Sequence, residues 1–308
     1  MSALTQAEVL NALAGELQAR SGPTQTEFRR VVVDSRVAER GDLFVALPGE
    51  RVDGHAFVAE AAERGATGAL IEHPVEGVPP GVALFQVPST LRALQLLAAE
   101  RRRSAAVRVV AVTGSVGKTT CKELVASVLG TRFRVHKNEA NQNNEVGLPL
   151  TILAMDRATE VAVLEMGMYA RGEIALLASI ARPEVGVVTN VGPIHLERLG
   201  SIEGIAEAKA ELVEALPSDG VAILNGDDRR VAAMAERTEA RALLYGEGPA
   251  CHVRGSDLRT RGLAGITFRI SYEGGTTEVA TRVPGRVGMM NCLAAAAAGL
   301  AFGMPLDE

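Results

Sequence analysis

The sequence lacks the features that mark membrane, secreted and nucleic-acid-binding proteins. No apolar run reaches the length of a membrane-spanning helix. The first 18 residues mix Glu8, Asn11 and Glu16 among apolar positions, which predicts a surface helix rather than a signal peptide. The formal net charge of −5 at pH 7 argues against a general nucleic-acid-binding surface. We therefore expect partners that are neither membranes nor nucleic acids.

Cysteine is also scarce. Cys121, Cys251 and Cys292 are scattered, with neither the spacing of a metal site nor that of a disulfide framework. This usage predicts reduced thiols in a cytoplasmic protein. No internal repeat or low-complexity segment interrupts the 308 residues, of which 47% are hydrophobic and 22% charged. Such a composition is typical of a soluble globular chain with room for two domains.

Alternating strand and helix patterns predict an α/β fold in two parts. A small α/β unit is expected over residues 1–88, with helices at 5–18 and 57–64 and strands at 31–34, 41–47 and 68–71. After a helix at 90–103, strands and helices alternate, which favours a parallel sheet covered on both faces within residues 89–308. Strict alternation at 267–272 and 278–283 predicts a β-hairpin extension, followed by a helix at 289–302.

A glycine-rich run between a strand and a helix carries the main functional signal. It follows the apolar residues 107–112 and precedes a helix expected at 118–129, so backbone N–H groups and the helix dipole form an anion site. Lys118 can reach the β- and γ-phosphates of a nucleotide, and the Thr119 hydroxyl can bind Mg²⁺. The match to a phosphate-binding loop is incomplete, because Val112 stands where its first glycine would fall. The predicted nucleotide contacts are Gly114, Ser115, Val116, Gly117, Lys118, Thr119 and Thr120.

Two further candidates lie at strand ends. Glu165 closes an apolar strand, where a carboxylate beside a phosphate loop can hold Mg²⁺. His195 follows the next strand, and ligands of open α/β sheets gather at the carboxyl ends of strands. A histidine taken alone is more often structural or on the surface, but this placement favours a metal role.

Lys209 lies on the apolar stripe of a predicted helix at 202–216, together with Ile202, Ile205 and Leu212. A lysine in such a position can snorkel to water, pair with an acid, or lose its proton, and a neutral amine can take up CO₂ as a carbamate. Position alone favours snorkelling. An amide-rich segment at 138–144 offers donors and acceptors to a polar substrate through Asn141, Asn143 and Asn144, although asparagines also favour solvated turns.

These motifs together resemble the Mur ligase family, and most closely those members that add D-alanyl-D-alanine to a UDP-N-acetylmuramoyl-tripeptide. The matching segments span nearly the whole chain in order. They are Asp34-Ser35-Arg36, residues 41–49 with Asp53-Gly54-His55, residues 113–120, Asn141 with Asn143-Asn144, Glu165-Met166-Gly167, residues 189–197, residues 200–209 and Asn291.

The resemblance implies an ATP-dependent amide ligase of peptidoglycan precursor synthesis that works through an acyl phosphate. It implies a small N-terminal uridine-binding domain, with Ser35 and Arg36 as substrate contacts, and a central parallel-sheet ATPase domain. One Mg²⁺ would be held by Thr119 and Glu165 and a second by His195 and a carbamylated Lys209, while Asn291 would lie beside adenine. We expect a cytoplasmic monomer acting on small-molecule substrates.

The sequence departs from the family pattern in two ways. Val287-Gly288 replaces the His-Asn pair often found before the adenine-site asparagine. Family members also continue into a third, C-terminal domain, whereas this chain ends at Glu308, so we expect a truncated chain that is inactive alone. The alternatives are another ligase of the superfamily, of the diamino-acid-adding or folylpolyglutamate synthetase type, and a nucleotide-binding module without ligase chemistry.

Overall fold

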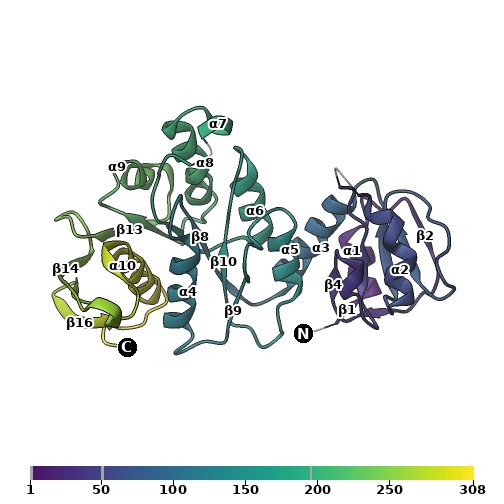
Figure 1. Ribbon diagram of the computed structural model, residues 1–308, viewed down its shortest axis with the longest axis horizontal. Coiled ribbons are helices and arrows are strands. Elements are labelled where there is room, and N and C mark those ends of the chain that lie inside the picture. The colour runs from purple at the N-terminus through teal and green to yellow at the C-terminus, as the bar shows by residue number, and fades with distance from the viewer. Residues whose placement is uncertain (1–2, 50–51, 195) are drawn as a thin grey trace. The chain divides into compact units, whose positions relative to one another are not determined.

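The computed structural model describes residues 3–49, 52–194 and 196–308 (Figure 1). It divides into two compact units. The first unit contains Met1–Ala106 and Glu145–Ala158, and the second contains Val107–Asn144 and Thr159–Glu308. Each unit has its own sheet.

The first unit is built on a five-stranded sheet in the order β2-β7-β6-β5-β4. Strands β4 to β7 are parallel, and β2 pairs antiparallel with β7 at the edge. Their bounds are Ala19–Ser21 (β2), Val31–Val32 (β4), Leu43–Val45 (β5), Gly68–Ile71 (β6) and Ala83–Gln86 (β7). Two short strands, Leu4–Thr5 (β1) and Glu27–Phe28 (β3), form a separate antiparallel pair. The helical segments are Gln6–Ala12 (α1), Ser35–Val37 (η1), Gly54–Phe57 (η2), Val58–Glu63 (α2), Thr90–Ser104 (α3) and Gly147–Leu153 (α5).

Helix α3 packs with the first unit, although the sequence pattern suggested a domain boundary at residue 88. Ala93, Leu94 and Leu97 of α3 are fully buried in one hydrophobic core with Leu43 of β5 and Phe85 of β7. Helix α5 packs on the same core, even though about forty residues of the second unit separate α3 from α5 along the chain. Compact packing therefore divides the chain after residue 106 and returns residues 145–158 to the first unit.

The second unit contains a nine-stranded sheet in the order β16-β15-β14-β13-β12-β11-β8-β10-β9. The strands β8 to β14 pair in parallel with their neighbours, whereas β14, β15 and β16 pair antiparallel. Strands β15 and β16 are the expected hairpin. Their bounds are Arg108–Thr113 (β8), Val135–Lys137 (β9), Val161–Glu165 (β10), Val185–Val188 (β11), Val221–Asn225 (β12), Arg241–Gly246 (β13), Val253–Thr260 (β14), Ile266–Tyr272 (β15) and Gly275–Thr281 (β16).

Helices cover both faces of this second sheet, because alternate residues of each buried strand point to opposite sides. Val185 and Val187 of β11 pack in the core beneath helices α4 (Lys118–Leu129) and α10 (Gly285–Ala301), which lie side by side in Figure 1. Gly186, between them, faces Leu212 of helix α8 (Ile202–Glu214). The remaining helical segments are Glu173–Ala181 (α6), Leu196–Leu199 (α7), Arg229–Ala232 (α9), Ala233–Arg237 (η3) and Gly262–Ala264 (η4).

The α/β class and the parallel sheet with its hairpin extension are confirmed. The helix expected at 5–18 is wrong in extent, because α1 ends at Ala12 and the chain turns to enter strand β2. The elements that were not predicted include β1, β2, β3, β7, β9, β14, α5 and α7. Within the described ranges, every helix is too short or too polar to cross a membrane.

Candidate functional site

The phosphate loop joins the end of β8 to the start of α4. Both of its glycines are required by the backbone. Gly114 has φ +150°, and a Cβ there would lie 1.9 Å from the Thr189 hydroxyl oxygen. Gly117, the N-cap of α4, has φ +84° in the left-handed region. The loop can therefore turn sharply and present the amino end of a twelve-residue helix to an anion.

The end of the neighbouring strand β11 holds this loop in place. Backbone N–H groups of Ser115 and Val116 donate to the Asn190 carbonyl and side-chain oxygens, at 3.0 and 2.9 Å. The Asn190 amide donates back to the Val116 carbonyl at 2.7 Å. The Ser115 hydroxyl accepts from the Gly192 N–H at 2.8 Å. The segment following β11 therefore forms one wall of the phosphate site and fixes the loop conformation.

Lys118 lies across the loop. Its ammonium donates to the Gly114 carbonyl at 2.9 Å, so the cation is held where phosphates would sit. Burial lowers the pKa of Lys118, and the negative charge of Glu165 opposes that shift. The lysine is therefore a desolvated cation aimed into the anion site.

Glu165 lies at the carboxyl end of β10 and is 2% exposed. One carboxylate oxygen accepts from the Thr119 hydroxyl and the other from the Asn143 amide, both at 2.8 Å. The Thr119 and Glu165 oxygens thus converge beside Lys118. Carboxylate and hydroxyl oxygens are the hard ligands that Mg²⁺ prefers, so the residues present fit such an ion.

A polar cleft of about 580 Å³ surrounds these groups. Its lining residues are Gly117, Lys118, Thr119, Thr120, Asn141, Asn143, Asn144, Glu165 and Tyr169. The structure thus brings the three predicted asparagines to the same cleft as the phosphate loop. Asn141 and Asn144 are exposed there, whereas Asn143 is half-buried by its bond to Glu165.

Sequence reasoning did not single out Tyr169 or Lys122. Tyr169 reaches the cleft from the segment after β10, and the Arg198 guanidinium lies over its ring at 5.2 Å from the centroid. Its position four residues beyond Glu165 was the available signal. Lys122 is buried on α4, three residues after Thr119, which places both on neighbouring turns of one helix.

Lys209 is 1% exposed on α8, so the expectation from position alone that it would snorkel to water is wrong. Burial lowers its pKa from 10.5 to about 7, and the positive charge of Lys118 adds to the effect. A substantial fraction of the amine is therefore neutral near pH 7, which is the state that reacts as a nucleophile.

The other two site predictions in the second unit differ in outcome. His195 lies outside the described residues. Asn291 on α10 is 4% exposed, and its amide lies 3.2 Å from where a Cβ of Gly117 would be. It lines a second hollow of about 310 Å³, together with Asn190, Asp227 and the exposed Val287.

The predicted substrate contacts in the first unit already have partners of their own. Ser35 is buried, and its hydroxyl donates to the Glu60 carboxylate at 3.1 Å. Arg36 is exposed and pairs with Asp34 at 2.7 Å. Hydrogen bonds from Arg36 lower the pKa of Asp34 to about 2. Of these side chains, Arg36 is therefore the one available to an incoming ligand.

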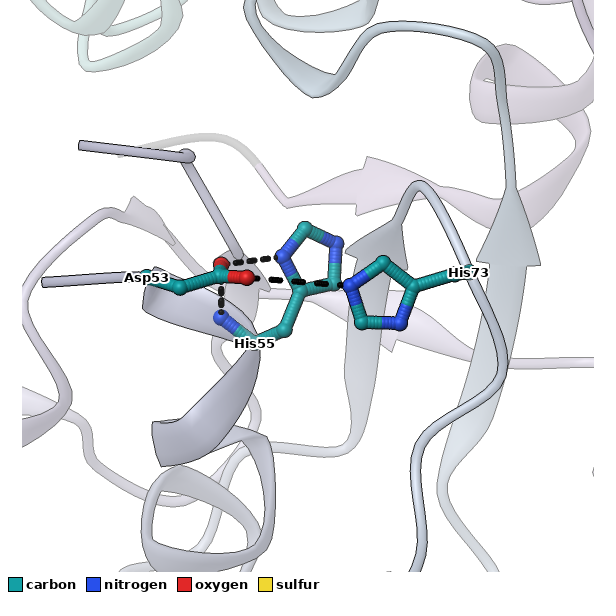
Figure 2. A group of neighbouring side chains, drawn as sticks. All are labelled: Asp53, His55 and His73. Carbon is teal, nitrogen blue, oxygen red and sulfur yellow. Dashed lines mark hydrogen bonds and ion pairs between the residues drawn. The ribbon is translucent and has the colours of Figure 1, made fainter. Parts of the chain in front are cut away.

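A second polar cluster in the first unit joins Asp53, His55 and His73 (Figure 2). His55 Nδ1 lies 2.6 Å from an Asp53 carboxylate oxygen, and His73 Nε2 lies 3.7 Å from the other. The two rings stack with centroids 4.1 Å apart and planes inclined by 23°. Ligand atoms of this kind and spacing raise the question of a metal site.

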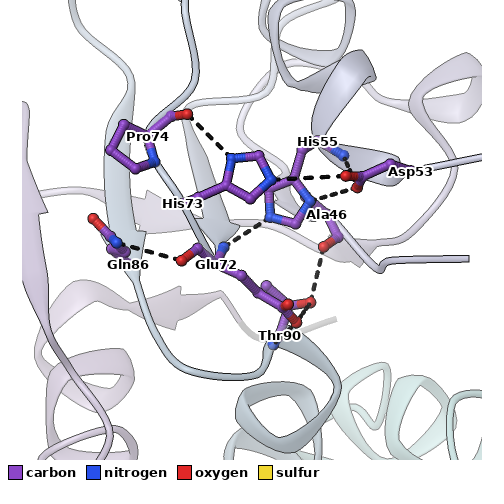
Figure 3. A network of polar contacts seen from close by, with 8 residues as sticks. All are labelled: Ala46, Asp53, His55, Glu72, His73, Pro74, Gln86 and Thr90. Atoms are coloured by element: carbon purple, nitrogen blue, oxygen red, sulfur yellow. Dashed lines mark hydrogen bonds and ion pairs between the residues drawn. The ribbon is translucent and has the colours of Figure 1, made fainter.

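The hydrogen bonds of His55 argue against a metal there. Its Nε2 accepts from the Glu72 N–H at 2.7 Å, so the only lone pair of the neutral ring is used and Nδ1 carries a proton to Asp53 (Figure 3). Lone pairs in two nearly parallel rings also do not converge on one ion. The cluster instead connects the loop at Asp53 to Glu72, whose carboxylate accepts from the Thr90 N–H at the start of α3.

Comparison with known proteins agrees with this geometry. The profile of the Mur ligase middle domain matches residues 112–299, and the profile described as Mur ligase family, catalytic domain matches residues 27–102. The UDP-N-acetylmuramoyl-tripeptide--D-alanyl-D-alanine ligase of Bacillus subtilis is 43% identical over 92% of this chain and 61% of its own length.

Solved structures give the same result. MurF from Acinetobacter baumannii superimposes with a TM-score of 0.91 at 32% identity, over 100% of this chain and 67% of that one. MurF ligase from Thermotoga maritima in complex with ADP gives 0.81 at 32% identity, over 90% of this chain and 64% of that one. The chain thus spans about three-fifths of the length of its Bacillus relative. The two profile matches and the similar relatives indicate one family, and the phosphate loop beside Glu165 agrees with it. The chain belongs to the Mur ligase family.

Proposed function

We propose that this chain carries the nucleotide-binding and nucleotide-sugar-binding parts of an ATP-dependent ligase that joins D-alanyl-D-alanine to a UDP-N-acetylmuramoyl-tripeptide in peptidoglycan precursor synthesis. The observation that carries the proposal is the convergence of Lys118, Thr119 and Glu165 in one polar cleft. The names of the relatives supply the substrates.

The chain's own residues would act mainly by positioning. Loop N–H groups and Lys118 bind the β- and γ-phosphates of ATP, and the substrate carboxylate attacks the γ-phosphorus in line to give an acyl phosphate and ADP. The incoming amine then attacks the acyl carbon, phosphate leaves, and one proton is released. Mg²⁺ held by Thr119 and Glu165 would neutralise developing phosphate charge.

A second metal ligand would come from Lys209. The neutral amine adds to CO₂, forming an N–C bond and releasing one proton, and the resulting carbamate is a carboxylate ligand. The lowered pKa of Lys209 supports this reaction, because only the neutral amine reacts. His195 is proposed as a partner ligand to the same Mg²⁺. Asn291 and the hollow beside Asn190 would receive the adenosine part of ATP.

The first unit is proposed to bind the uridine diphosphate part, with Arg36 as an exposed cation for the diphosphate and Ser35 as a second contact. We further propose a cytoplasmic location, supported by the three scattered cysteines, each of which is free, and a monomeric state. The relatives are longer, and the complete ligation is proposed to need the further length that they have.

Calorimetric titration of ATP into the 308-residue chain tests the proposal. Wild-type protein should bind ATP more tightly with Mg²⁺ than with EDTA. Lys118→Ala should weaken binding by about ten- to a hundredfold, since a hydrogen bond to a charged group contributes roughly 1.5–3 kcal/mol. Lys137→Ala, which removes a cation outside the cleft, is the matched control and should bind like wild type.

Two results would contradict the proposal. Unchanged ATP affinity in Lys118→Ala would remove the loop assignment. A second test uses a chain extended to the length of its relatives. If that chain binds ATP but UDP-N-acetylmuramoyl-tripeptide does not change its nucleotide turnover, the protein is instead a nucleotide-binding module. D-alanyl-D-alanine addition by the 308-residue chain alone would contradict the need for the additional length.

A further inference from the structure

A buried lysine that the proposed mechanism does not use lies on helix α4, three residues after Thr119 of the cleft. Lys122 on α4 is 1% exposed. Its ammonium donates to the Asn138 carbonyl at 2.6 Å. Burying an ammonium costs free energy, and an apolar side chain would fill the same space without that cost. The position of Lys122 therefore calls for a role beyond packing.

Asn138, the residue that Lys122 contacts, fixes the backbone at Glu165. Asn138 is fully buried, and its side-chain oxygen accepts from the Glu165 N–H at 2.9 Å. Its amide donates to the Glu165 carbonyl at 3.1 Å and to the Gln142 carbonyl at 2.9 Å. One side chain thus continues the pairing of β9 with β10 by two hydrogen bonds and also ties down the loop that follows.

The contacts close into a ring that includes the metal-ligand candidates. Glu165, held by Asn138, accepts from Thr119 and from Asn143. Thr119 lies on α4, three residues before Lys122. Helix α4, the end of β10 and the loop after β9 are therefore connected through Lys122, Asn138, Glu165 and Thr119. We therefore expect a change at any one of them to shift the carboxylate relative to the phosphate loop.

The negative charge that pairs with Lys122 comes from Glu123, which is partly exposed. Glu123 pairs with Lys122 at 3.1 Å and also with Lys137 of β9. Glu123 and Lys137 are 46% and 39% exposed, so solvent screens their pair. Of Lys122, Glu123 and Lys137, only Lys122 is buried and donates to the Asn138 carbonyl. Its removal would leave the Asn138 carbonyl without this donor, whereas removal of Lys137 would not.

We propose that Lys122 is a positioning residue for the metal–phosphate site, which fixes Asn138 and, through it, the Glu165 carboxylate and the asparagine loop. The inference rests on the proposed function, because it assigns Glu165 to a Mg²⁺·ATP complex. Partners that orient a metal ligand typically change metal affinity by about ten- to a hundredfold when removed. The role of Lys122 should therefore be visible in the Mg²⁺ dependence of nucleotide binding.

The test is the ratio of ATP affinities with excess Mg²⁺ and with EDTA, measured by calorimetry on the 308-residue chain. Lys122→Met keeps the length of the side chain and removes the donor, and should reduce this ratio by about tenfold or more relative to wild type. Affinity in EDTA, which depends on the loop and Lys118, should stay close to that of wild type. Lys137→Met removes the exposed partner of the same Glu123 and should leave the ratio unchanged.

Each outcome decides the matter. A folded Lys122→Met protein with the wild-type ratio would overturn the inference, as would an equal loss in Lys137→Met. Should Lys122→Met fail to fold, as judged by circular dichroism, the ratio is read on Lys122→Gln. This variant retains a neutral donor and should keep only part of the Mg²⁺ effect, so an unchanged ratio overturns the inference. Wild-type protein without any Mg²⁺ effect would overturn the proposed function itself and this inference with it.

Discussion

At the scale of single residues, burial decides what the charged groups of the cleft can do. Glu165 is buried, and its carboxylate accepts hydrogen bonds from the Thr119 hydroxyl and the Asn143 amide, which satisfy it in place of water. Lys209 is buried with the positive charge of Lys118 nearby, and both effects favour its neutral form. Burial with hydrogen-bond partners therefore holds Glu165 in place, whereas burial beside a like charge changes the ionisation of Lys209.

Lys209 should make the stability of the chain depend on pH. Its pKa is about 7 in the folded chain against 10.5 when unfolded. Below pH 7 both states are protonated and the folded state bears the full cost of the buried charge. Between pH 7 and 10.5 only the unfolded state is protonated, so stability rises with pH, by at most about 1.4 kcal/mol per unit. The difference in stability between wild type and Lys209→Met, measured by thermal melts in CO₂-free buffer, should show this rise with pH.

The same pair of proteins tests the carbamate. With ¹³C-bicarbonate and Mg²⁺, wild type should give a carbamate carbon signal that is absent from Lys209→Met. A stability difference that does not change between pH 7 and pH 9 would show that Lys209 remains an ammonium in the folded chain. A plain ammonium together with tight Mg²⁺·ATP binding would refute the carbamate as a metal ligand.

At the scale of elements, the residues that follow strand β11 hold the phosphate loop in its conformation. Gly114→Ala would place a Cβ 1.9 Å from the Thr189 oxygen at a φ of +150°, and should lower the free energy of unfolding by about 3 kcal/mol or more. Gly172→Ala is the matched control, because its φ is +87° but its Cβ would meet no atom within 4 Å. This control should cost about 1 kcal/mol. Urea denaturation measures both.

Equal losses of stability in the two glycine variants would mean that strand β11 does not clamp the loop as the structure shows. A selective loss in Gly114→Ala, together with weaker ATP binding, would support the clamp through Asn190 and Thr189. The comparison separates backbone strain, which both variants share, from the close approach of β11, which only Gly114 has.

Elements with a strong local pattern were predictable, and those held by distant partners were not. Helix α4 begins and ends where the sequence predicts, because glycines flank an uninterrupted helical stretch. Strand β9 has three residues and depends on pairing with β10 and on the clasp of Asn138. Strand β14 lacks alternation, because its register with β15 shifts between Ser256 and Arg259.

The candidate site shows the same division. Lys118 and Glu165 were placed together from the rule that ligands gather at the carboxyl ends of parallel strands. Position alone left the burial of Lys209 open, since a stripe position is compatible with both snorkelling and full enclosure. Lys122 was also missed, because nothing in the local sequence shows that its ammonium meets the backbone of a loop sixteen residues away.

At the scale of the whole molecule, the chain leaves its first unit and returns to it. Residues 107–144 belong to the second unit, and α5 then packs back on the core of the first. The first unit is therefore assembled from two separate stretches of sequence. This arrangement makes truncation a sensitive test of what holds the unit together.

A fragment of residues 1–88 should fail to fold, although the sequence pattern suggests a self-contained unit there. It lacks Leu94 and Leu97 of α3, each at most 1% exposed, and their burial contributes about 1.5–3 kcal/mol per side chain. It also lacks Thr90, whose N–H donates to the Glu72 carboxylate after β6 and whose hydroxyl donates to the Ala46 carbonyl after β5. Losses of this size approach the whole stability of a small domain.

Residues 1–106 joined to residues 145–158 by a flexible linker should restore both helices and unfold cooperatively. Circular dichroism melts and the dispersion of amide NMR signals would compare the two fragments directly. Cooperative unfolding of the 1–88 fragment at the temperature of the joined fragment would show that α3 and α5 are dispensable. The joined fragment should then be titrated with UDP-N-acetylmuramic acid. Absence of binding by a folded first unit would count against the uridine assignment of Ser35 and Arg36. Absence of binding by an unfolded fragment would not, because its binding site would not be formed.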